Sequence, residues 1–191
     1  MLLRAASVLF LLVCATSTPA MERALEKKVL LDATVDQVWQ AWTTREGIRS
    51  FFAPDAEIDA RVDGAFHIFI NPYAEPGMKG ADTMRFLALQ PKTMLSFDWN
   101  APPSLPATRS QRTFVVLRFE PRGNQTRLTL FHTGWGSSDG VDGKAWDATY
   151  AYFDKAWGNV LANLQKRFAP GGQPIDWTEW NEQMKRMSAP K

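Results

Sequence analysis

Hydrophobic residues recur in the last third of the chain at the three- and four-residue spacing of an amphipathic helix. The positions on this stripe are Trp146, Tyr150, Phe153, Trp157, Val160, Leu161, Leu164 and Phe168. They predict one long helix that carries several large rings, and Ala169-Pro170-Gly171-Gly172 ends it. A short terminal helix is expected from Ile175 to Met187, with Trp177 and Trp180 on its apolar side.

Alternating apolar and polar positions predict β-strands in the middle of the chain. The expected strands cover residues 26–33, 55–62, 65–71, 81–89, 93–100, 110–120 and 125–132. Asp63-Gly64 is expected to form a tight hairpin turn between two of them, because both residues tolerate positive φ. Residues 71–80 and the proline-rich segment 101–109 are expected to be loops.

Two short helices are predicted between the first and second strands. Thr34 and Gln37 have the spacing of a capping box, in which each side chain satisfies a free backbone N–H group. The second helix begins near Thr44 and ends at Pro54. Because strands and helices are segregated along the chain, the fold class is α+β, with a six- or seven-stranded antiparallel sheet curved around the long helix. Such a sheet can pack closely against one end of the helix and less closely against the other, and a cavity is expected at the less closely packed end.

The first twenty residues have the pattern of a secretory signal peptide. Arg4 gives a positive start, VLFLLVCA is a short apolar run, and Thr18-Pro19-Ala20 is a small-residue cleavage site. The expected protein is secreted or periplasmic, with a domain at 21–170 and an extension at 171–191. A true start at Met21 would instead leave it cytoplasmic. Cys14, the one cysteine in the chain, lies inside this segment, so cleavage would remove it.

Composition restricts the function classes. The net charge is +2 and the charges are interspersed, which argues against nucleic-acid binding and against a polybasic membrane anchor. Motifs for metal or nucleotide binding, such as H-E-x-x-H, paired C-x-x-C and G-x-G-x-x-G, are missing from the sequence, so neither metal nor cofactor is expected. Twelve Phe and eight Trp are more large rings than a helix–sheet interface requires.

His132 is the most informative single residue. Strand alternation places it on the inward face with Leu128 and Leu130. Three roles are open: a histidine satisfied by a neighbouring polar group, a polar anchor for a ligand, and an acid–base catalyst. His67 falls on the outward face of its strand, so a metal site that uses both histidines is not expected.

The ring-bearing positions are the candidate lining of a ligand cavity. Besides His132, the candidates are Phe66, Ile68, Phe97, Trp99, Phe119, Trp135, Tyr150, Phe153 and Trp157. Tyr150 would add a second polar tip, and Trp135 would close the mouth. No residue is assigned a catalytic role.

Four segments, in order along the chain, resemble the activator-of-heat-shock-ATPase-like family. They are VWQAWTTREGIRSFFAP, the DG-x-F sequence from Asp63 to Phe66, TRLTLFHTGW and AYFDKAWGNVLANLQKRF. The resemblance covers about residues 26–168 and implies the helix-grip fold of the START-like, or SRPBCC, superfamily. It also implies a deep apolar pocket between the long helix and the sheet. Arg45, where a proline is common, and the proline-rich loops depart from the family pattern.

The expected function is binding of a small apolar or amphipathic molecule in that pocket. A polyketide-cyclase- or dehydratase-like enzyme that uses His132 is one alternative. A chaperone-interaction module, if the protein is cytosolic, is another. The expected partners are the small ligand alone, with neither nucleic acid nor membrane insertion after signal cleavage, and the expected state is a monomer or weak dimer.

Overall fold

A computed structural model describes residues 23–138, 140 and 142–189, so the predicted signal segment lies outside the described residues. The elements in chain order are β1 (Leu25–Leu31), α1 (Val35–Thr43), α2 (Arg45–Arg49), β2 (Asp55–Ile58), β3 (Phe66–Phe69), β4 (Gly80–Ala81), β5 (Phe86–Gln90), β6 (Met94–Trp99), α3 (Pro106–Arg109), β7 (Thr113–Arg122), β8 (Gln125–Thr133), α4 (Gly143–Phe168) and α5 (Thr178–Ser188). The α+β class is confirmed, as are the long helix and the capping box at Thr34 and Gln37.

The strands form two antiparallel sheets instead of one. The order in the larger sheet is β1-β8-β7-β6-β5, and the smaller sheet has the order β2-β3-β4. The prediction of a single six- or seven-stranded sheet was therefore wrong. Asp82 explains the break, because its carboxylate accepts the N–H groups of Gly77 and Lys79 at 2.6 and 3.4 Å. This local bonding ends β4 after two residues, although the alternation continues to residue 89.

β2 and β3 form the predicted antiparallel hairpin, but the tight turn expected at Asp63-Gly64 was wrong. The pairing of Ile58 with Phe66 leaves a longer loop, 59–65, between β2 and β3. Asp63 does adopt positive φ, at 62°, but its N–H donates to the carbonyl of Phe86. Gly64 accepts from the Phe86 N–H, and a Cβ at Gly64 would lie 2.1 Å from the Asp59 oxygen. The loop therefore joins the smaller sheet to β5.

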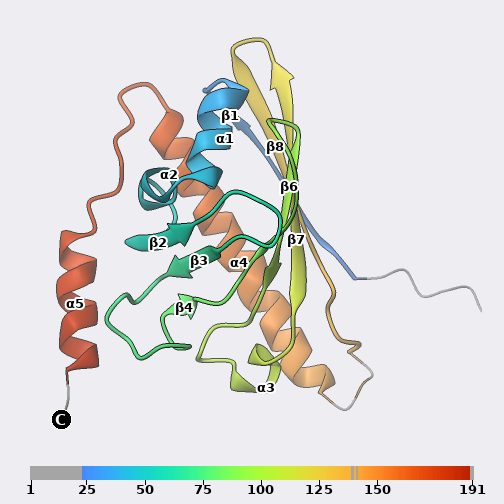
Figure 1. Cartoon of the computed structure of the whole chain (residues 1–191). Helices are drawn as coiled ribbons and strands as arrows, with labels where there is room; N and C mark the ends of the chain where they lie inside the picture. The colour runs from blue at the N-terminus through green and yellow to red at the C-terminus, as the bar shows by residue number, and fades with distance from the viewer. Residues whose placement is uncertain (1–22, 139, 141, 190–191) are drawn as a thin grey trace, which may run out of the picture.

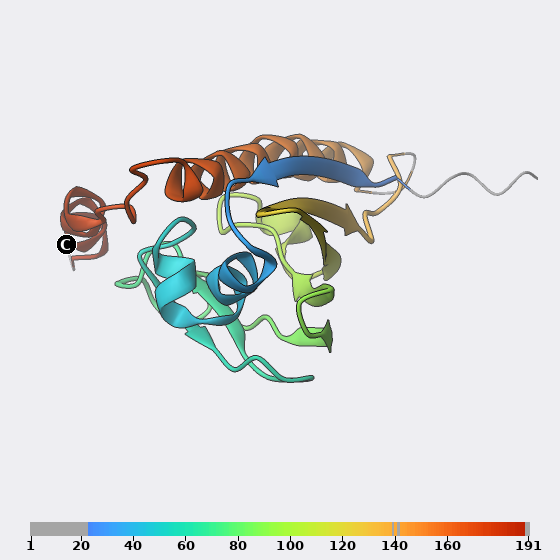
Figure 2. The same ribbon diagram turned by 90° about the horizontal axis from the view of Figure 1, so that it is seen from above.

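The long helix α4 lies beside β1, and the larger sheet curves away from it toward β5 and the smaller sheet (Figure 2). Its buried face carries the predicted stripe, including Trp146, Phe153, Trp157 and Leu164. The proline-rich segment 101–109, expected to be a loop, contains the short helix α3 with Pro106 as its first residue, where a missing N–H costs nothing.

The C-terminal extension runs from the end of α4 to the side of the smaller sheet, and α5 lies at the edge of the molecule (Figures 1 and 2). Two indole N–H groups anchor it: Trp177 donates to the Arg49 carbonyl at 2.6 Å and Trp180 to the Ile70 carbonyl at 2.7 Å. The helix begins at Thr178 instead of Ile175, because the Asp176 carboxylate accepts the N–H of Thr178 at 2.9 Å. The extension therefore has specific contacts with the domain.

Candidate functional site

His132 is fully buried on β8 and both of its ring nitrogens are hydrogen-bonded within the protein. Nδ1 accepts the indole N–H of Trp157 at 2.8 Å, and Nε2 lies 2.7 Å from the hydroxyl of Thr113. Since an indole nitrogen can only donate, Nδ1 carries no proton and the neutral ring is protonated at Nε2. The Thr113 hydroxyl then donates onward to the carbonyl of Trp99, at 3.3 Å.

Burial lowers the pKa of His132 to about 3, because the charged imidazolium cannot be solvated there. The Trp157 donor acts in the same direction, since a proton on Nδ1 would face the indole N–H. The imidazole is therefore neutral at physiological pH. These are the contacts of a satisfied structural histidine, and neither nitrogen has a position left for a ligand or for proton transfer.

The rings nearest His132 belong to Trp135 and Phe153, with centroid distances of 4.1 and 5.0 Å. Trp135 is bound in place by an N–H bond to the His132 carbonyl, at 2.8 Å. Tyr150 lies farther out: its hydroxyl donates to the Ala24 carbonyl, and the Arg23 guanidinium lies 3.8 Å from its ring centroid. Its polar tip is thus engaged by the residues that precede β1.

Four other candidates lie within the hydrophobic core. Phe66 and Phe97 are fully buried with ring centroids 4.1 Å apart, and Ile68 is fully buried beside them on β3. Phe119 packs edge-on against Trp39 of α1 at 5.4 Å. These rings join the larger sheet to the smaller sheet and to α1.

A cavity of about 150 Å³ lies between the smaller sheet, the end of β6 and α4. Three of the predicted residues line it: Trp99, Phe153 and Trp157. The other lining residues are Phe52, Ile70, Gly80, Ala81, Asn100, Pro102, Tyr152, Ala156 and Val160. The cavity is therefore mainly apolar, and it is open on one side, where the side chain of Tyr152 is 44% exposed.

Two lining residues carry buried polar atoms that have no hydrogen-bond partner within the described part of the chain. These atoms are Nε1 of Trp99, a donor, and Oδ1 of Asn100, an acceptor. Both residues are less than a tenth exposed. An unpaired buried polar group costs about 1–3 kcal/mol, so this donor and acceptor are the polar groups through which the cavity could recognise a ligand.

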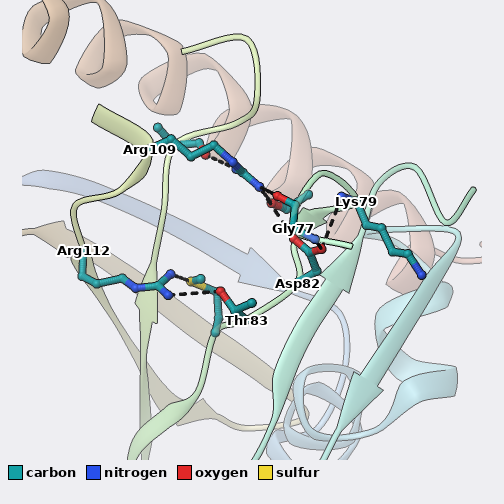
Figure 3. Close-up of polar contacts among 9 residues, drawn as sticks. Gly77, Lys79, Asp82, Thr83, Arg109 and Arg112 are labelled. Atoms are coloured by element: carbon teal, nitrogen blue, oxygen red, sulfur yellow. Dashed lines mark hydrogen bonds and ion pairs between the residues drawn. The ribbon is translucent and has the colours of Figure 1, made fainter. Parts of the chain in front are cut away.

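Arg109 links the segments 71–80 and 101–109, which lie beside the cavity (Figure 3). Its guanidinium donates to the carbonyls of Ala101, Gly77 and Gly80, and it lies 3.6 Å from the Asp82 carboxylate. Both charged side chains are largely buried. Burial lowers the pKa of Arg109 while the Asp82 charge raises it, and the arginine stays protonated. The network fixes the backbone of β4 and of the segment after Trp99, where they line the cavity.

The sequence analysis did not predict several of the residues that line the cavity, although the helical spacing of three of them was visible in the sequence. Tyr152, Ala156 and Val160 follow one another at four-residue spacing, one position before Phe153, Trp157 and Leu161. This second stripe lies directly beside the predicted one on α4. Asn100 follows Trp99 at the end of β6, but no sequence pattern shows that its amide is buried.

The described residues contain no group of three or more His, Cys, Asp or Glu side chains that could hold a metal ion. None of the helices in the described ranges is long and apolar enough to cross a membrane.

Solved structures share this arrangement at low sequence identity. CalU16 from Micromonospora echinospora is 21% identical, with 87% of this chain and 81% of that chain covered and a TM-score of 0.59. The Aha1 dimer from Colwellia psychrerythraea is 17% identical, with coverage of 78% and 98% and a TM-score of 0.57. DynU16, from the dynemicin biosynthetic locus, is 18% identical over 79% of this chain and 48% of that chain, with a TM-score of 0.55. Among curated protein sequences, none matches this chain significantly.

The curved antiparallel sheet and the long C-terminal helix define a protein with the helix-grip fold. The profile described as "Activator of Hsp90 ATPase homolog 1-like protein" matches residues 32–169, most of the chain. The chain belongs to that family.

Proposed function

We propose that this protein binds a small, mainly apolar molecule that carries one polar group, in the cavity between α4 and the smaller sheet. The observation that carries this proposal is an apolar cavity lined by Trp99 and Asn100, which have a donor and an acceptor without a partner among the described residues. Apolar area removed from water would supply most of the affinity, at about 25 cal/mol per Å². The two polar groups would set the orientation.

The size of the cavity limits the ligand. A cavity of roughly 150 Å³ accommodates one benzene-sized ring, and this one is about 150 Å³. The buried part of the ligand is therefore a single ring or a short branched chain. A larger ligand would extend past Tyr152 into solvent.

The polar atoms limit its chemistry. Nε1 of Trp99 and Oδ1 of Asn100 are closed to solvent, so a ligand would reach them only if the side chains around them move as it enters. A group that both accepts and donates, such as a primary amide or a phenol, would pair with both atoms. An alkane of equal size would fill the space but leave both atoms unpaired.

Catalysis in the same cavity is the alternative. DynU16 belongs to a biosynthetic locus, which fits a cyclase-like enzyme. His132 does not favour this alternative, because both of its nitrogens are bonded and its pKa is about 3. Tyr152, whose pKa is raised by burial, is the titratable group in the lining and would act only as a proton donor.

Export stays part of the proposal and rests on residues 1–20. A secreted or periplasmic protein meets its ligand outside the cytosol. A form translated from Met21 would lack the signal, stay in the cytosol and be open to the chaperone-interaction role that the family description suggests for the homologue. Both forms begin at Met21, so the compartment separates them: protein with this N-terminus in a periplasmic fraction supports export, and protein found in the cytosol alone contradicts it.

The experiment is an NMR titration with benzamide, phenol and toluene. We expect benzamide and phenol to move the Trp99 indole N–H resonance, because it gains an acceptor, and toluene to bind without that shift. Ala156→Leu fills the cavity from α4 and should abolish all three responses. Ala151→Leu, an exposed position on the same helix, is the matched control. Binding that survives in Ala156→Leu would contradict the proposal.

A further inference from the structure

A second hollow lies outside the helix–sheet interior. It has a volume of about 620 Å³, is open to solvent, and is bordered by α1, α2, the last turn of α4 and Pro174, Ile175 and Trp177 of the extension. Ordinary small-molecule sites have volumes of roughly 300–1,000 Å³. The residues that line it are all different from those of the cavity. We call this hollow the outer groove.

The extension forms one wall of the outer groove. The Ile175 N–H donates to the carbonyl of Ser50 at 3.0 Å, and the Trp177 indole N–H donates to that of Arg49 at 2.6 Å. These bonds hold the segment against α2 at a fixed distance from the end of α4. The groove therefore depends on the extension, whereas the cavity is lined by residues that precede it.

The charged residues of the lining give it a net positive charge. Arg49 and Arg167 project from the ends of two helices, and within the described part of the chain neither forms an ion pair with a carboxylate. Nε of Arg167 is buried and has no acceptor among those residues. Glu46 is the one acidic side chain in the lining, so the lining carries a net charge of +1. A single negative charge would complement it.

The apolar part of the lining is also substantial. Phe168, Ile175 and Trp177 are each half-buried and provide a surface for a hydrocarbon or aromatic body. The Arg167 guanidinium carbon lies 5.6 Å from the Phe168 ring centroid, so the charge and the apolar wall are adjacent. An occupant would carry its anionic group directly beside its apolar body.

We propose that the outer groove is a second binding site, for a small amphipathic monoanion whose charged group pairs with Arg167 and whose apolar body rests on Phe168, Ile175 and Trp177. Carboxylates and phosphate or sulfate esters share the required chemistry. The site is independent of the cavity.

Arg167 also has a simpler role, because a cation in the last turn of a helix stabilises the helix dipole. Lys166 lies in the same turn of α4, is exposed and does not line the groove. Lys166→Ala therefore removes the same charge from the same helix end, and it serves as the matched control for Arg167→Ala.

The probe is anilinonaphthalene sulfonate, an anion that fluoresces in apolar sites, and its uncharged analogue phenylnaphthylamine. We expect saturable binding of the anion to the whole protein, about tenfold weaker in Arg167→Ala, since a charge-assisted hydrogen bond is lost. Phenylnaphthylamine should bind the wild type about tenfold less tightly and be indifferent to Arg167→Ala. Lys166→Ala should change either affinity by less than about twofold. Arg167→Lys, which keeps the charge and the helix end, should weaken the anion by about threefold.

Two further experiments distinguish a carboxylate from a phosphate headgroup, and the outer groove from the cavity. Octanoate and octyl phosphate should displace the probe and octanol should not, and the more effective anion identifies the preferred headgroup. Ala156→Leu, which fills the cavity, should leave probe binding unchanged. If Arg167→Ala and Lys166→Ala weaken binding of the anionic probe equally, the effect comes from the net charge of the helix end and not from Arg167 in the groove, and the proposal is overturned. Displacement by octanol, or loss of binding in Ala156→Leu, would overturn it as well.

Discussion

Trp157 on α4 donates its indole N–H to Nδ1 of His132 on β8 across 2.8 Å of buried space. This bond joins the long helix to the larger sheet and determines which imidazole nitrogen is protonated. The second nitrogen completes a chain through Thr113 to the carbonyl of Trp99, a residue of the cavity wall. The histidine therefore acts on the cavity through Trp99, which it helps to position.

The pH dependence of stability should report on His132. Folding lowers its pKa from 6.5 to about 3, so between these values the unfolded chain binds a proton that the folded chain does not. Stability is fully present above pH 6.5 and falls as the pH approaches 3, by on the order of 4 kcal/mol from this residue. Urea unfolding at several pH values, compared with His132→Gln, isolates the contribution. Parallel curves for the two proteins would mean that the pKa is not depressed.

Thr113 should be sensitive to loss of its hydroxyl. Thr113→Val keeps the shape but leaves the Nε2–H of His132 without an acceptor, so we expect a loss of about 1–3 kcal/mol in unfolding free energy. Thr113→Ser keeps the hydroxyl and should cost less than about 1 kcal/mol. Chemical denaturation measures both. If Val is tolerated as well as Ser, the hydrogen bond from His132 contributes nothing.

Arg109 should contribute far more to stability than an exposed arginine does. Arg109→Met leaves Asp82 buried without its cation and removes three hydrogen bonds to carbonyls, so we expect a loss of about 3 kcal/mol. Arg122→Met breaks the exposed pair with Glu120 and should cost at most about 1 kcal/mol. Thermal unfolding of the two variants measures both losses. Similar losses of unfolding free energy in Arg109→Met and Arg122→Met would contradict this prediction.

The C-terminal helix should open before the domain unfolds. Trp180→Phe removes the N–H bond to Ile70, one of the few anchors of α5. We expect amide exchange within 178–188 to rise about tenfold or more, while exchange in β7 and β8 is unchanged, because local openings have their own free energies. Leu87→Ala, an exposed position on β5, is the control. A uniform rise throughout the chain would show that α5 is part of the cooperative core.

Local patterns were sufficient for the elements whose hydrogen bonds are local. The capping box at Thr34 and the apolar stripe of α4 follow from spacing alone, because helix contacts repeat every three or four residues. Alternation also placed His132 inward. Alternation failed at residues 81–89, where the Asp82 carboxylate binds backbone N–H groups, and the turn signal at Asp63-Gly64 failed to predict the longer loop, whose backbone bonds to Phe86.

The sequence by itself determined the fold class, the family resemblance and the apolar face of the long helix, since periodicity and local motifs carry that information. Only the tertiary structure decided which of the rings fill the core and which border open space. It also decided that both nitrogens of the His132 imidazole are hydrogen-bonded and that Arg167 lines a groove. Among the described residues, Nε1 of Trp99 and Oδ1 of Asn100 have no hydrogen-bond partner. Whether a buried polar atom has a partner depends on residues distant in the chain, and no local pattern encodes their positions.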